Sequence, residues 1–168
     1  MDKSKVINAI RQELEEQQVP CGELEEQPGL QWFLPLSEAY EQDYAVGELF
    51  FASDVTQEEM DGVALAQINL IFARELPAER VDALRAFFAK VNRLISGGRF
   101  DAQEEESCFA EYGHDLVLPL DLSDEQAANA IAVAMDLASA YIRFVYEGVR
   151  GIAAGDWTVE AAMETVYQ

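Results

Sequence analysis

The sequence predicts an α+β fold in which helices pack on an antiparallel five-stranded sheet. Apolar residues recur at helical spacing in three long segments, and shorter segments between them have the pattern of strands. The predicted order is helix, three strands, helix, two strands and a long helix, followed by a short C-terminal helix. Half of the 168 residues are hydrophobic, which is enough for one core, and no linker is long enough to divide the chain. We therefore expect residues 1–168 to form a single domain.

The core of this domain is expected at about residues 3–155. Its first helix is predicted at 3–18, where apolar residues recur at helical spacing, and Pro20 and Gly22 should end it. A polar connector rich in Glu is expected at 20–29.

Three strands are predicted after the connector. Alternating apolar and polar residues predict strands at about 30–36 and 63–73, and a segment that ends in Leu-Phe-Phe predicts another at about 44–52. The links at 37–43 and 54–62 are short and acidic, so an antiparallel meander is the simplest pairing of the three.

The second helix is the clearest element in the sequence. Pro77 suits its first turn, where the missing N–H costs nothing. Gly97 and Gly98 should end it, because glycine adopts the left-handed conformation that helix ends favour. One face of this helix is apolar along its length: Val81, Leu84, Phe87, Phe88, Val91, Leu94 and Ile95.

Two further strands are predicted at about 99–104 and 108–118, joined by an acidic turn. Ser123 then begins a capping box that opens a long helix, expected to run to about Ile152. The short last helix is expected at about 158–167.

Two local patterns match those of a known family. The segment from Phe87 to Leu94 precedes Gly98-Arg99-Phe100, as in a family helix that carries an Asn and leads into a Gly-x-Phe strand start. A strand that ends near Leu120 then feeds a helix from Ser123. In these features the chain resembles the YbjN-like family of bacterial sensory transduction regulators, which has the type III secretion chaperone-like fold. The resemblance implies an α+β sandwich, frequent homodimers and protein-binding roles, and it carries over no catalytic residue.

The charge balance limits which partners we expect. Eleven Lys and Arg stand against 32 Asp and Glu, for a net charge of −21, and six of the eleven lie between Arg74 and Arg99. Phosphate contacts need a basic surface, so neither nucleic acid nor an anionic membrane is an expected partner. We expect a non-enzymatic module that binds a protein partner, chaperone-like or regulatory. The alternative is an acidic mimic or inhibitor that captures a basic protein.

No group of residues in the sequence predicts catalysis, a metal site or a cofactor. Cys21 and Cys108 lie far apart and are expected to be free thiols, and His114 is the only histidine. Two Cys and one His are too few for a zinc site made by protein ligands alone. The segment near the N-terminus is charged and lacks a long apolar stretch, so we expect a cytoplasmic protein.

The long helix predicts a homodimer. Apolar side chains extend around most of its circumference, and a sheet can cover only one side. We expect Ile131, Met135 and Ile142 to face the sheet. The second apolar set is the predicted protein interface, and the short C-terminal helix is the alternative cover for it: Val133, Leu137, Tyr141 and Phe144.

Overall fold

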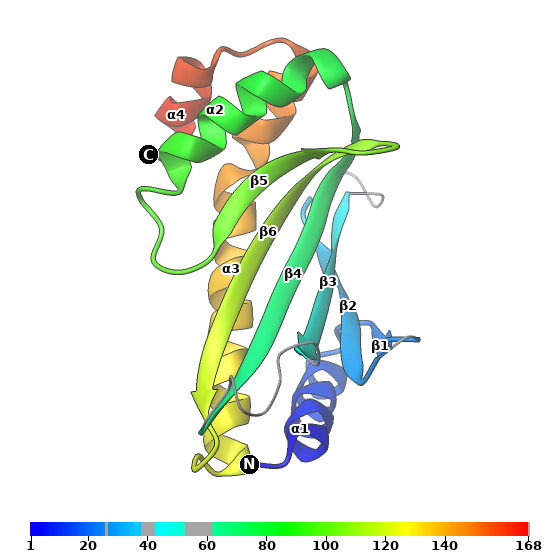
Figure 1. Cartoon of the computed structure of the whole chain (residues 1–168). Helices are drawn as coiled ribbons and strands as arrows, with labels where there is room; N and C mark the ends of the chain where they lie inside the picture. Colours follow the sequence, from blue (N-terminus) through cyan, green and yellow to red (C-terminus); the bar gives the residue numbers. More distant parts are fainter. Residues whose placement is uncertain (26, 38–42, 53–61, 168) are drawn as a thin grey trace.

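The structure, a computed structural model, is an α+β domain with one antiparallel sheet of six strands in the order β1-β2-β3-β4-β6-β5. It describes residues 1–25, 27–37, 43–52 and 62–167. Helices α1 and α3 lie behind the sheet in Figure 1, and α2 and α4 lie together at one end of it. The elements are α1 (Lys3–Glu16), β1 (Cys21–Glu23), β2 (Gly29–Pro35), β3 (Tyr44–Phe51), β4 (Val63–Leu76), a 3-10 turn (Ala78–Arg80), α2 (Val81–Val91), β5 (Arg99–Glu104), β6 (Cys108–Pro119), α3 (Asp124–Ala154) and α4 (Val159–Val166).

The hydrophobic core lies between the sheet and the helices. Strand β4 alternates in burial along its length, and its even-numbered residues from Ala64 to Phe72 are fully covered. Helix α3 packs against β4 and β6, and Ile131, Met135 and Ile142, which the sequence analysis expects to face the sheet, are buried. The odd-numbered residues of β4 point to the opposite face, because successive strand side chains alternate.

Helix α3 is the longest element, with 31 residues. The capping box is present, since the Ser123 hydroxyl accepts the Gln126 N–H and the Gln126 side chain accepts the Ser123 N–H. By length and composition alone this helix is apolar enough to cross a membrane. Core helices of globular domains pass the same test, and here one side of α3 is buried against the sheet.

Gly148 and Gly151 allow other elements to approach the last turns of α3. A Cβ on Gly148 would lie 2.8 Å from Cζ of Phe87 and 3.4 Å from Cβ of Ala162, so this position lets both α2 and α4 pack closely. A Cβ on Gly151 would overlap the ring of Trp157. Both glycines therefore serve close packing, and the helix continues to Ala154.

The prediction of five strands was wrong, because part of the expected polar connector forms a sixth. Strand β1 pairs antiparallel with β2, with Cys21 opposite Trp32 and Glu23 opposite Leu30. Three residues are too few to show an apolar alternation. Pairing with β2, rather than local propensity, makes this segment a strand.

Two helices end earlier than predicted. Helix α1 stops at Glu16, because Gln18 takes a left-handed conformation with φ of 60° before Pro20 is reached. Helix α2 stops at Val91, and the following turns carry Leu94 into solvent. Strand β4, by contrast, continues past a bulge to Leu76. The predicted acidic links at 37–43 and 54–62 fall largely outside the described residues.

Candidate protein-interaction surfaces

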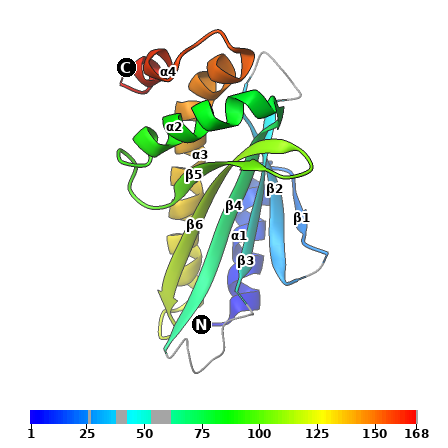
Figure 2. The same cartoon turned by 45° about the horizontal axis from the view of Figure 1, so that its top comes forward.

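The face of the sheet turned away from α1 and α3, here called the open face, carries carboxylate, amide and apolar side chains. It looks toward the viewer in Figures 1 and 2, and below α2 no helix of the described residues crosses it. Its carboxylates come from three strands, β3, β5 and β6: Glu48, Asp101, Glu111 and Asp115. Apolar side chains lie among them, including Phe33, Ile71 and Val117, of which Phe33 is 37% and Val117 is 64% exposed.

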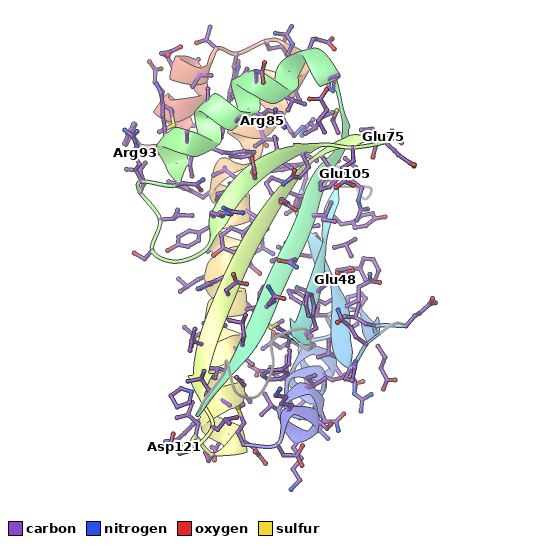
Figure 3. The ribbon with its side chains drawn as sticks, viewed as in Figure 1. Glu48, Glu75, Arg85, Arg93, Glu105 and Asp121 are labelled. Atoms are coloured by element: carbon purple, nitrogen blue, oxygen red, sulfur yellow. The ribbon has the colours of Figure 1, made fainter. Side chains whose placement is uncertain are left out.

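Strand register brings these side chains together. Glu48 on β3 lies opposite Asn69 on β4, and Gln67 on β4 lies opposite Asp115 on β6. A shallow hollow of about 700 Å³ follows this part of the face, lined by Glu48, Asn69 and Asp115 together with Arg99. Figure 3 labels Glu48 over the middle of the sheet.

The carboxylates of the open face are held mainly by neutral amides. Gln67 Nε2 donates to Asp115 Oδ1 at 2.9 Å, and Gln103 Nε2 donates to Glu111 Oε1 at 2.6 Å. None of the four ion pairs found among the described residues involves a carboxylate of this face. An amide positions a carboxylate but leaves its charge, so the open face keeps a negative potential.

The outer side of α3 forms a second candidate surface, here called the α3 stripe. It consists of Val133, Leu137, Ala140 and Phe144, which lie within about 60° of one another at ~100° per residue. Val133 is 59% exposed, Leu137 is 40% exposed and Phe144 is 44% exposed. Three of the four predicted interface residues are thus on the surface together.

Tyr141, the fourth predicted interface residue, lies beside the stripe and is half-buried. Its hydroxyl accepts the Ser96 N–H at 3.2 Å and lies 3.4 Å from the Ser96 carbonyl oxygen. This side chain ties α3 to the segment that follows α2.

The C-terminal helix covers a different part of α3. Helix α4 packs on α2 and α3, with Ala162 next to the buried Gly148. Phe144 remains exposed, so α4 does not cover the α3 stripe. Tyr167, just after α4, is itself 71% exposed.

The free edge of the sheet at β5 is closed by α2. Asn92 Nδ2 donates to the Phe100 carbonyl at 2.9 Å, and the Phe100 N–H donates to Asn92 Oδ1 at 2.8 Å. Arg85 Nε donates to the Ala102 carbonyl at 3.0 Å, in keeping with its place between α2 and β5 in Figure 3. A partner strand could not pair with these groups without displacing α2.

The cysteines and the histidine do not form a nucleophilic site. Cys108 and His114 are six residues apart on β6, about 20 Å at ~3.4 Å per residue. Burial, with Glu15 adding to it, raises the pKa of the Cys21 thiol and so disfavours the reactive thiolate. His114 is half-buried with its Nδ1 unpartnered. No group of three potential metal ligands occurs among the described residues.

The sequence alone did not predict the open face. Alternation along β4 and β6 shows which residues share a side of each strand, and this signal was visible in Gln67 and Asn69. The sequence does not show that β6 pairs between β4 and β5, and it is this order that gathers Asp115, Glu111 and Asp101.

Comparisons with known proteins identify a family and include a similar solved structure. Residues 54–147 match the model of the YbjN family, described as "Putative bacterial sensory transduction regulator". The crystal structure of YbjN from E. coli, described as "a putative transcription regulator", has a TM-score of 0.47 and 14% sequence identity over 82% of this chain and 88% of that chain. No curated protein matches the chain.

Proposed function

The chain belongs to the YbjN family, and we propose that it is a non-enzymatic regulator that works by binding another protein on the open face. The proposal combines the family's description as a regulator with the chemistry of a broad sheet surface that, below α2, no helix of the described residues covers. Binding of this kind needs neither a metal nor a cofactor.

The proposal rests on the mixture of apolar and polar side chains on the open face. Interfaces between proteins that form and separate combine apolar and polar surface in nearly equal parts. The open face has this mixture, since Ile71 and Phe33 lie near the carboxylates of Glu48 and Glu111. A partner that buried the apolar side chains would also meet directional acceptors that fix its orientation.

A second candidate function is electrostatic capture of a basic protein. The observation that favours it is the pairing of the open-face carboxylates with amides, which leaves their charge uncompensated on a molecule of net charge −21. In this case the protein would act as an acidic mimic or inhibitor, and attraction over distance would dominate the binding.

Matched charge reversals test the proposed site. The open-face variant combines Glu48→Lys, Glu111→Lys and Asp115→Lys. The control combines Glu13→Lys, Glu16→Lys and Glu164→Lys, which are exposed on α1 and α4 and change the net charge by the same amount. Each form is used to capture binding proteins from native lysate, and the captured proteins are identified by mass spectrometry at low and high salt.

We expect one defined protein to bind the wild type and the control but not the open-face variant. Retention of that protein at high salt supports docking on a mixed surface, whereas its loss at high salt supports electrostatic capture. Equal binding to the wild type and to a folded open-face variant would refute the open face as the site.

A further inference from the structure

We propose that Arg74, held against the ring of Tyr44, anchors an acidic segment of the partner protein at one end of the open face. The inference rests on the proposed function for the place where the partner docks. It names one chemical feature of that partner, a carboxylate, and the side chain that receives it.

Tyr44 and Phe33 form an aromatic platform at the end of the sheet where β4 leads into α2 (Figure 1). Tyr44 is the first residue of β3 and lies on the same side of that strand as Glu48, because strand side chains alternate. Its ring packs against that of Phe33, with centroids 5.8 Å apart and 65° between the ring planes. Tyr44 is 41% exposed, so a partner on the open face can reach the platform.

Arg74 lies over this platform. Its Cζ is 5.7 Å from the centroid of the Tyr44 ring. An arginine held over a ring by cation–π attraction still offers the N–H donors of its guanidinium, and their fork geometry matches a carboxylate. Because the ring restricts the guanidinium before a partner arrives, less entropy is lost on binding. Arginine and tyrosine are also the residues in which interface binding energy is concentrated.

The bulge of β4 gives Arg74 this position. Between Phe72 and Leu76 the strand departs from its regular pairing with β6. On either side of Arg74, Ala73 and Glu75 have left-handed backbone conformations, with φ of 47° and 57°. Neither is glycine, so both conformations cost free energy, and strain of this kind is concentrated at binding sites. The bulge takes Arg74 out of the alternation of β4, and its guanidinium reaches the ring on β3.

The charge of Arg74 has no carboxylate partner in the described part of the chain. Arg74 takes part in none of the four ion pairs there, not even with the adjacent Glu75. A cavity of about 440 Å³ lies beside it, bordered also by Asp43 and Tyr146. Asp43 Oδ2 lies 3.8 Å from Arg150 Nη1, and Asp43 accepts a hydrogen bond from the Tyr146 hydroxyl. A carboxylate from a partner would therefore supply the contact that Arg74 lacks.

An NMR titration tests this contact. The probe is a short peptide with both ends blocked, in which glutamate alternates with leucine, and the reference peptide has glutamine in place of glutamate. The Arg74 Nε–H signal, identified by its loss in Arg74→Lys, should shift and saturate with the glutamate peptide but not with the glutamine peptide. Arg93 is the internal control, since it is exposed on α2 and also lacks an ion pair among the described residues.

Two substitutions separate the fork and the platform from the charge. Arg74→Lys keeps the positive charge without the fork and should weaken binding of the glutamate peptide by about fivefold. Tyr44→Leu removes the ring beneath Arg74 and should weaken it by about threefold. Arg93→Lys should leave the affinity unchanged. The affinities come from the backbone amide signals of β4, which also show that each variant is folded.

Three results would overturn the proposal: an Arg74 signal that moves with neither peptide, one that moves equally with both, or an Arg93 signal that responds as strongly. The open-face variant tests the proposed function separately, because its charge reversals leave Arg74 in place. An unresponsive Arg74, with a partner that still requires the open-face carboxylates, refutes only the acidic anchor. A partner that binds the open-face variant as well as wild type, with a responsive Arg74, refutes only the proposed function.

Discussion

At the scale of the residue, the contacts of Asn92 explain the family pattern of an Asn followed by a Gly-x-Phe strand start. Its side-chain amide donates to and accepts from the backbone of Phe100, as a neighbouring strand residue would. Phe100 is buried and stacks on Phe88 with ring centroids 5.4 Å apart. The Asn in the helix and the Gly-x-Phe strand start are thus two halves of one contact.

Asn92→Ala should lower the free energy of unfolding by about 2 kcal/mol, because two hydrogen bonds are lost and the Phe100 backbone groups lose their partner. Asn129→Ala is the control, since Asn129 is exposed on α3 and Ala suits a helix. Urea denaturation gives both values. A loss below about 0.5 kcal/mol for Asn92→Ala would show that water replaces the side chain without cost.

Tyr112 should make the fold sensitive to alkaline pH. Burial, with Tyr141 adding to it, raises its pKa from 10.0 to about 12. The folded state holds the proton to higher pH than the unfolded state, so this stability is complete below about pH 10 and is lost as pH rises toward about 12.

Phenylalanine has no group that ionises, so the free energy of unfolding of Tyr112→Phe should fall less steeply with rising pH than that of wild type. The substitution also removes the hydrogen bond from the hydroxyl to the Gly97 carbonyl, which lowers stability equally at every pH. Tyr146, whose pKa is also raised, leaves part of the alkaline loss in place. Identical slopes for wild type and Tyr112→Phe would contradict the assignment.

At the scale of the element, periodicity predicted every helix and five of the six strands, and it failed at their ends. The end of α1 shows why. The Val19 N–H donates to the Leu14 carbonyl and the Gln18 N–H donates to the Glu15 carbonyl, a Schellman motif with Gln in place of the usual Gly. A helix end of this kind depends on backbone hydrogen bonds, which the pattern of apolar residues does not show.

Gln18→Gly should stabilise the protein by about 0.5–1 kcal/mol, because glycine adopts the left-handed conformation without a steric penalty. Gln17→Gly is the control: Gln17 has helical dihedrals with φ of −78°, so glycine there gains nothing. Thermal unfolding of both variants checks this. A midpoint for Gln18→Gly that is equal to or below that of Gln17→Gly would contradict it.

At the scale of the whole molecule, charge and topology determine what the surface can do. Composition predicted one acidic domain. It could not predict the strand order that creates the open face. Residues from β3, β5 and β6 are distant in sequence and meet only through the sheet. The stripe on α3 could be predicted because its residues share one helix.

Added salt should raise the thermal midpoint. The net charge of −21 opposes compaction, and salt screens this repulsion over a Debye length of ~8–10 Å. The four ion pairs among the described residues lie at or near the surface and contribute little. A midpoint that falls between dilute buffer and moderate NaCl would show that attractive ion pairs outweigh the repulsion.

Site-specific photo-cross-linking tests the central claim, partner binding on the open face, most directly. A photoreactive amino acid replaces Ile71, on the open face, or Glu164, exposed on α4. Both proteins are irradiated in native lysate with the same partner present. The account predicts a cross-link to one defined protein from position 71 and none from position 164. A cross-link from 164 alone, from a folded protein that still binds its partner, would contradict it.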